Sequence, residues 1–82
     1  MIDFVKQTDR VNAIGPNGIL IAYIKKHYFG THGHSSGWEH WIYCPDLGDF
    51  VWAGAIQVEQ LGYPCFFRNV KQFKEYYAAR LD

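Results

Sequence analysis

Residues 14–24 read IGPNGILIAYI, in which four turn-forming residues separate two apolar segments. Proline presets its backbone φ for a turn, and asparagine and glycine tolerate positive φ, so residues 15–18 predict a tight turn between two strands. The second strand, residues 19–29, begins with apolar side chains at successive positions, which is typical of a strand buried on both faces. One face is expected to hold Ile19, Ile21 and Tyr23, and the other Leu20, Ala22 and Ile24. This strand should therefore lie in the middle of a sheet.

A second hairpin is expected further along the chain. Residues 38–44 read WEHWIYC and residues 50–53 read FVWA, and the PDLG of residues 45–48 between them favours a turn. The alternation of residues 55–61 fits a continuing strand. The same residues also fit a short helix, which the glycine and proline just beyond them would end. We favour the strand. Residues 65–67 are expected to form a short last strand.

The C-terminal segment predicts one amphipathic helix. Asn69 is a good N-cap, and Gln72 stands three residues later as in a capping box. At helical spacing the apolar residues share one face and the polar residues lie away from it. The apolar face holds Val70, Phe73, Tyr77 and Leu81, and the polar residues are Lys71, Gln72 and Glu75.

Strands followed by a single helix indicate an α+β fold. We expect residues 1–82 to form a single domain, an antiparallel sheet of four to five strands with one C-terminal amphipathic helix packed on one face. The chain holds three Trp, six Tyr and six Phe, and one helix covers only one face of such a sheet. Some rings should therefore lie on the open face, and a contiguous exposed apolar patch usually marks an interaction surface.

The charge of the chain is balanced overall but uneven along its length. Eight Lys and Arg balance eight Asp and Glu, which removes the positive charge that nucleic acids and anionic membranes attract. Residues 27–67 contain all four histidines, four acidic residues and no Lys or Arg. Carboxylates favour the charged form of a nearby imidazole, so one interpretation is that these histidines titrate near neutral pH. We favour the alternative, in which the positive ends and the negative middle merely neutralise one another on the surface.

Segments that would direct the chain to a membrane are not evident. No run reaches the roughly 20 apolar residues of a membrane span, and the first residues do not read as a signal peptide. We therefore expect a cytoplasmic protein with no membrane partner. In that compartment Cys44 and Cys65 should be reduced rather than bridged.

The histidines supply one candidate metal site. His32 and His34 are two residues apart in a glycine-rich segment, and with His40 or His27 they provide imidazole ligands that suit Zn²⁺. Three such ligands and a bound water would make the protein a metal-dependent enzyme. We favour a polar connection that happens to contain histidine, because the two close-spaced ligand pairs of zinc motifs are missing. We therefore expect no cofactor, with zinc as the alternative.

Residues 30–37 have two further interpretations. Residues 33–37 match the G-x-S-x-G pattern of serine hydrolases, but a strand rather than a helix is expected after them, and 82 residues cannot build that scaffold. Backbone N–H groups of a glycine-rich loop can also bind phosphate, although the Walker lysine spacing is missing. We expect a surface loop that adds specificity where it contacts a partner.

The three tryptophans favour a binding function over a catalytic one. Across the turn at residues 45–48, Trp41 and Trp52 should face each other with Tyr43 nearby. At least one tryptophan is expected in the core, and the others suit an interface, where Trp and Tyr carry much of the binding energy. The expected partner-binding residues are Tyr28, Phe29, His32, His34, Trp38, Trp41, Tyr43 and Trp52.

Three classes of function remain open. The one we favour is a non-enzymatic protein-binding module, an inhibitor, adaptor or self-associating domain that presents the open face and the loop to another protein or to itself in a homodimer. Small proteins of this kind are common among phages and mobile elements, which is an analogy at the level of class only. The alternatives are a small-molecule or nucleotide-binding protein that uses stacked aromatic rings, and a metal-dependent enzyme with a histidine-rich site. Tyr and Lys side chains in residues 23–29 also suit single-stranded nucleic acid, but the acidic middle of the chain would repel phosphates.

Overall fold

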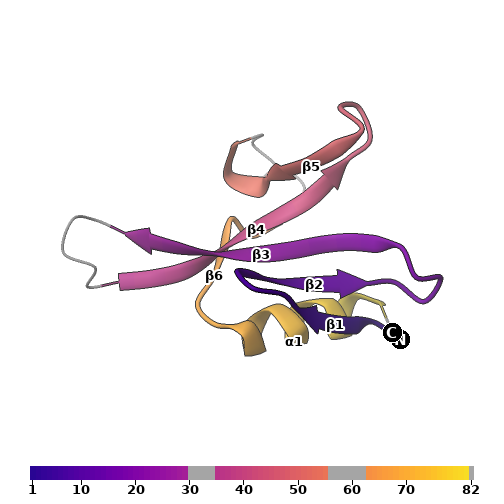
Figure 1. Ribbon diagram of the computed structural model, residues 1–82, viewed down its shortest axis with the longest axis horizontal. Helices are drawn as coiled ribbons and strands as arrows, with labels where there is room; N and C mark the ends of the chain where they lie inside the picture. The colour runs from indigo at the N-terminus through magenta and orange to yellow at the C-terminus, as the bar shows by residue number, and fades with distance from the viewer. Residues whose placement is uncertain (30–34, 56–62, 82) are drawn as a thin grey trace.

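The computed structural model of this chain describes residues 1–29, 35–55 and 63–81. Its strands are β1 (Asp3–Lys6), β2 (Arg10–Ile14), β3 (Leu20–Phe29), β4 (Ser35–Cys44), β5 (Asp49–Trp52) and β6 (Phe66–Phe67). A single turn of 3₁₀ helix (Ala53–Ala55) follows β5, and the helix α1 (Val70–Leu81) ends the described chain. This is the expected α+β fold, with an antiparallel sheet and one C-terminal helix (Figure 1).

The sheet is an antiparallel meander in the order β1-β2-β3-β4-β5. β3 lies in its middle, as the apolar run predicted, with β2 on one side and β4 on the other. Two strands pair with the other edge of β4. Trp41 to Cys44 pair with β5, and Trp38 and Glu39 pair with β6. The backbone N–H of His40 bridges the two pairings by donating to the carbonyl of Cys65 (3.0 Å).

The turn at residues 15–18 forms as its composition predicted. The N–H of Gly18 donates to the carbonyl of Gly15 (2.9 Å), and Gly18 adopts a φ of 80°, a conformation that side chains with a Cβ rarely adopt. The expected position of Ile19 was wrong. A register shift between Ala13 and Ile14 starts β3 at Leu20, and Ile19 is left in the turn with 58% of its surface exposed.

The first strand was not anticipated from the sequence. β1 pairs with β2 along its whole length, and a short polar turn closes this hairpin through a bond from the Gln7 N–H to the Arg10 carbonyl (2.7 Å). Residues 53–55 form a 3₁₀ turn, so the favoured continuation of a strand from residue 55 is wrong at its first residue. The remainder of that expected strand, residues 56–61, lies outside the described residues.

The helix α1 begins at the predicted cap. The side-chain oxygen of Asn69 accepts a hydrogen bond from the N–H of Gln72 (2.9 Å), and the Gln72 side chain accepts one from the N–H of Arg68 (2.9 Å). One of the N–H groups that a helix start leaves without partners is thereby satisfied, and the Arg68 N–H just before the cap is bonded as well.

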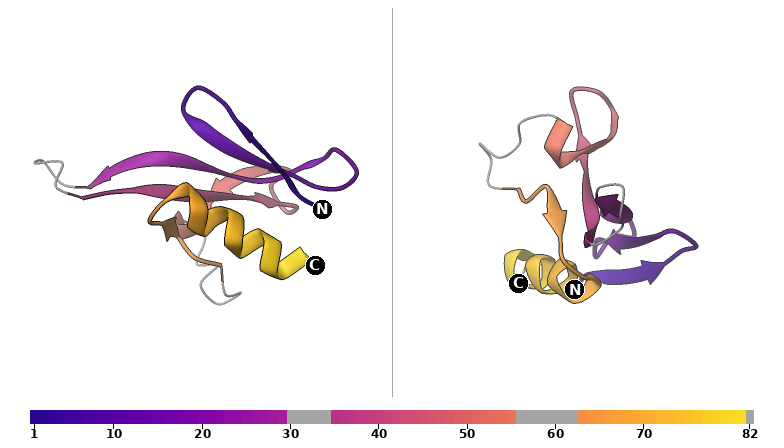
Figure 2. Two further views of the ribbon diagram at one scale, coloured as in Figure 1. Left: turned by 90° about the horizontal axis from the view of Figure 1, so that it is seen from below. Right: turned by 90° about the vertical axis from the view of Figure 1, so that its left-hand side faces the viewer.

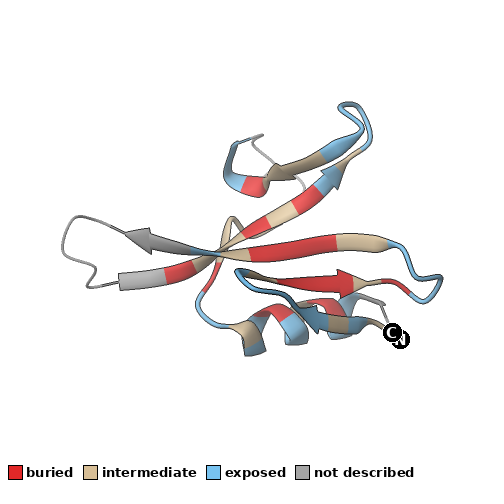
Figure 3. Cartoon of the chain, in the orientation of Figure 1, coloured by how far each residue is buried: buried red, intermediate tan, exposed pale blue. Residues whose placement is uncertain are grey.

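The core lies between α1 and one face of the sheet. Figure 2 shows α1 running along one side of β3 and β4. In Figure 3 the buried positions gather along the middle of β2, β3 and β4 and on α1. The buried apolar cluster consists of Val11, Ala13, Ala22, Ile24, Phe67, Phe73 and Tyr77. The apolar face predicted for the helix is therefore confirmed at Phe73 and Tyr77.

Candidate functional site

The sheet face opposite α1 carries a set of aromatic side chains that we call the aromatic face. Directly paired residues on neighbouring strands point to the same side of a sheet. Tyr23 pairs with Trp41, Trp41 with Trp52, Tyr43 with Phe50, and Glu39 with Phe66. Their neighbours along the strands, Ala22, Ile24, His40 and Ile42, are buried. The aromatic face therefore consists of Tyr23, Trp41, Tyr43, Phe50, Trp52 and Phe66.

Four of these rings form a continuous row across three strands. The Tyr23 and Trp41 rings are stacked nearly parallel, with centroids 5.7 Å apart and an interplanar angle of 8°. The Phe50 ring lies 5.5 Å from Tyr23 and 5.5 Å from Tyr43. Each ring contact restricts the orientation of the neighbouring ring, so the row is already ordered in the free protein.

Two cations lie over one end of this row. The guanidinium carbon of Arg10 is 4.7 Å from the Tyr23 ring centroid, and Lys25 Nζ is 5.3 Å from that of Trp41. Both distances are those of cation–π contacts. The Trp41 indole N–H donates to a carboxylate oxygen of Glu39 (3.1 Å), which is the residue paired with Lys25.

The other end of the row is the exposed and acidic one. Tyr43 is 48% exposed, and Leu47 in the β4–β5 turn is 65% exposed. Asp46 lies in the same turn, and Asp49 pairs with Cys44 at the end of β4. Tyr23, in contrast, is buried within the row, and this burial raises the pKa of its hydroxyl. Tyr43 is therefore the exposed ring of the row and Tyr23 the buried one.

Trp52 is held at the border of the aromatic face. Its indole N–H donates to the carbonyl of Cys65 (3.1 Å), and its ring lies 5.3 Å from Phe66. Gly54 comes so close to the ring that a Cβ there would meet a Trp52 ring atom at 2.7 Å. Trp41 and Trp52 are directly opposite each other, as predicted, and both are half-buried.

His40 lies on the helix side of β4 and is completely buried. Its Nδ1 is 2.9 Å from the carbonyl oxygen of Pro64, which can only accept, so Nδ1 carries the proton and donates. Nε2 then accepts from the Tyr77 hydroxyl, 2.6 Å away. Burial among aromatic rings lowers the pKa of His40 to about 4. The interpretation that the histidines titrate near neutral pH is therefore wrong for His40.

The proposed zinc ligands are not brought together by the described residues. Both ring nitrogens of His40 are already used in hydrogen bonds, which leaves none for a metal ion in this arrangement. His32 and His34 lie outside the described residues. Within the described ranges no group of three or more His, Cys, Asp or Glu side chains is placed to hold a metal ion.

The remaining residues of the predicted partner-binding set fall elsewhere. Trp38 pairs with Lys26 and Phe67 on the helix side of the sheet, so it is not part of the aromatic face. Tyr28 and Phe29 belong to β3 through their backbone pairing with Ser36 and Ser35. The sequence prediction missed Phe50 and Arg10, although alternation along β5 already placed Phe50 on the side of Trp52.

Comparison of the chain with protein-family models, with curated proteins and with solved structures finds no match. The one helix within the described ranges is too short and too polar to cross a membrane. Cys44 and Cys65 are both free thiols. The candidate site therefore depends on the geometry of this chain alone.

Proposed function

We propose that this protein is a non-enzymatic protein-binding module that contacts its partner through the aromatic face. The observation that carries the proposal is the row formed by Tyr23, Trp41, Phe50 and Tyr43 on the side of the sheet away from α1. Large rings with few rotatable bonds supply contact area at low entropic cost, and a row that is already ordered loses little freedom on binding.

The charges around the row define the partner. Arg10 and Lys25 lie at one end together with the Glu39 carboxylate, and Asp46 and Asp49 lie at the other, so the first end keeps an excess of positive charge. A complementary protein surface has an apolar centre, an acidic group opposite the first end and a basic group opposite the second. Nucleic acid fits less well, because its phosphates would be repelled by the exposed acidic end.

A second copy of this chain meets these requirements. A two-fold axis that lies across the strands would place the basic end of one copy over the acidic end of the other, with the two rows of rings between them. The structure of the free chain supports this arrangement through the charge polarity of the face. Inhibitor or adaptor activity toward another protein would use the same contacts.

The oligomeric state tests this proposal. Sedimentation velocity over a concentration series should show a dimer, and Tyr43→Ala should weaken it by about tenfold, as expected when an exposed ring that the interface would cover is truncated. Asp46→Lys should weaken it as well, and so should added salt. Ile19→Ala is the matched control, because Ile19 is exposed but lies in the β2–β3 turn.

A chain that remains monomeric at about 1 mM refutes the second copy as the occupant, since it bounds the dimer at weaker than about 4 kcal/mol. Dimerisation that Ile19→Ala weakens as much as Tyr43→Ala does would place the contact away from the aromatic face. The metal-dependent alternative depends on His32 and His34, and nothing in the described residues favours it. The small-molecule alternative is favoured by a separate hollow at one end of the sheet, beside the β1–β2 turn.

A further inference from the structure

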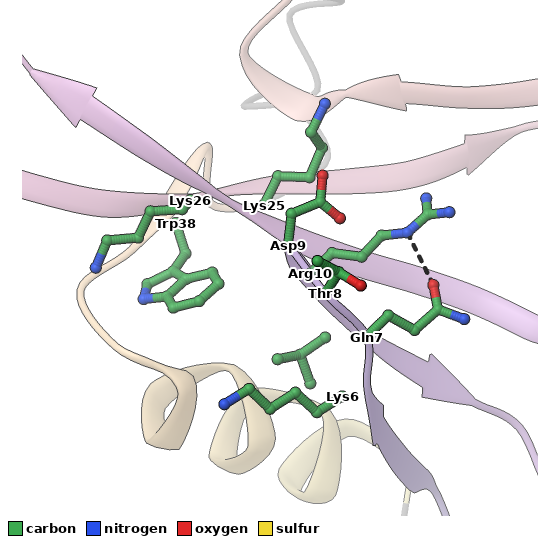
Figure 4. A pocket seen from close by; sticks show the side chains of 9 residues that line it. Lys6, Gln7, Thr8, Asp9, Arg10, Lys25, Lys26 and Trp38 are labelled. Atoms are coloured by element: carbon green, nitrogen blue, oxygen red, sulfur yellow. Dashed lines mark hydrogen bonds between the residues drawn. The ribbon is translucent and has the colours of Figure 1, made fainter.

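A hollow of about 510 Å³ opens at the end of the sheet where the β1–β2 turn meets β3 and β4. It is lined by residues 6–11 of the first hairpin, by Lys25 and Lys26 of β3, and by Trp38 of β4 (Figure 4). This volume lies within the range of pockets that hold drug-sized molecules. The hollow does not include any residue of the aromatic face.

The charge of the hollow differs from that of the chain. Four of the eight Lys and Arg side chains line it, namely Lys6, Arg10, Lys25 and Lys26, and Asp9 is the one carboxylate among the described residues of the lining. Arg10 and Lys25 are also directly paired on neighbouring strands, an arrangement in which like charges destabilise a sheet. The excess of positive charge in the lining as a whole favours a negatively charged ligand.

The wall on the helix side of the hollow is suited to a flat ring. Trp38 is half-buried, and Val11 beside it in the lining is buried. Lys26 Nζ lies 5.0 Å from the Trp38 ring centroid. In the view of Figure 4 the end of the Lys26 side chain lies beside the Trp38 indole, and the end of the Lys6 side chain lies below them. A flat ring stacked on that face of Trp38 would displace the Lys26 ammonium group, which would stay close enough to bind an anionic group attached to the ring.

The cations of the hollow divide between its two sides. Arg10 is turned toward Gln7, whose side-chain oxygen accepts a hydrogen bond from Arg10 Nε (3.2 Å). Arg10 and Lys25 also contact rings of the aromatic face. Lys6 and Lys26 lie on the side of Trp38 and are exposed. These two lysines are thus the side chains available to an anion that approaches Trp38.

We propose that this hollow binds a nucleotide, with the base stacked on Trp38 and the phosphates held between Lys6 and Lys26. Base stacking on an aromatic side chain and charge-assisted hydrogen bonds to phosphate are the two interactions that this geometry offers. A free nucleotide fits better than a nucleic acid strand, because the hollow has the size of a small molecule and the chain as a whole has no net charge. The site extends the function beyond the aromatic face and does not depend on it.

Titration of the ¹⁵N-labelled protein with ADP tests the proposal. The three indole N–H signals separate the two sites, because Trp41 donates to Glu39 and Trp52 to Cys65, whereas Trp38 lies in the hollow. Saturable movement of the Trp38 signal, with the other two nearly unchanged, is the expected result. Lys26→Glu and Lys6→Glu should each weaken ADP binding by about tenfold or more.

Lys71→Glu is the matched control, because Lys71 is an exposed lysine on α1 outside the lining of the hollow. It should leave the ADP affinity unchanged within about twofold. Because Lys6 and Lys26 are exposed, the charge reversals should keep the dispersed amide spectrum of the wild type, and Lys26→Gln provides a milder second variant.

Other ligands decide which part of the nucleotide is recognised. Inorganic phosphate and adenosine should each bind at least about tenfold more weakly than ADP. Equal binding of phosphate alone would overturn the role of Trp38, and equal binding of adenosine would overturn the role of the lysines. Tighter binding of a single-stranded oligonucleotide, or an unmoved Trp38 signal at about 5 mM ADP, would overturn the nucleotide site itself.

Discussion

Protonation of His40 is expected to couple the stability of the fold to pH. Burial lowers the pKa of the ring to about 4 in the folded protein, against 6.5 for an unperturbed histidine. The unfolded chain therefore takes up a proton first as the pH falls. The stabilising contribution of neutral His40 is complete above pH 6.5 and is lost progressively between pH 6.5 and about 4.

The magnitude follows from the width of this interval. Each pH unit within it costs about 1.4 kcal/mol of unfolding free energy, so acidification to about pH 5 should remove about 2 kcal/mol and the full interval about 3 kcal/mol. For a domain of this size that is a large share of the total stability. Protonation at Nε2 would disturb the hydrogen bond from the Tyr77 hydroxyl, whereas Nδ1 would still donate to the Pro64 carbonyl.

Urea denaturation at about pH 7 and about pH 5 measures this loss, with His40→Gln as the reference variant. Glutamine stays neutral and keeps a donor and an acceptor, so the variant should be less stable near pH 7 but should lose less stability on acidification. The other histidines are present in both proteins and cancel in the comparison. Equal losses of unfolding free energy in wild type and variant would refute a buried neutral His40.

Two other substitutions test packing and hydrogen-bond contacts next to His40 and Trp52. Tyr77→Phe should lower the free energy of unfolding by about 1–3 kcal/mol, because it leaves His40 Nε2 buried without its donor. Tyr76→Phe is its control and should change the free energy by less than about 1 kcal/mol, because the Tyr76 hydroxyl does not bond to His40 and its charged neighbour, Arg80, is exposed. Gly54→Ala should cost about 1–3 kcal/mol in thermal unfolding, because the new methyl group would meet the Trp52 ring at 2.7 Å, and an unchanged melting temperature would contradict that close approach.

The elements that the sequence predicted well are those specified by neighbouring residues. The turn at residues 15–18, the β4–β5 hairpin and the Asn69 cap each depend on side chains within a few positions, and all three form. The hairpin of β1 and β2 was missed because its turn, Gln7 to Asp9, contains no glycine or proline. The shift at Ile14 was missed because a bulge depends on how two strands twist against each other.

The candidate site was predicted only in part, for the same reason. Alternation along the strands is local, so it correctly placed Trp41 opposite Trp52. The role of His40 depends on Pro64 and Tyr77, which are 24 and 37 residues away in the chain. A local sequence pattern cannot predict such distant hydrogen-bond partners. The basic hollow arises because two hairpins bring lysines together that are 20 residues apart in the sequence.

His40 and Trp41 are adjacent in β4 and serve opposite sides of the sheet. The first ties the strand to α1 through Tyr77, and the second stacks on Tyr23 in the aromatic row. Because one peptide unit joins them, mildly acid conditions that loosen the interior would also disorder the rings outside. If a partner complex dissociated in acid, the cause would then be partial unfolding of the sheet that carries the rings. It would not be a change in the charge of a residue at the interface.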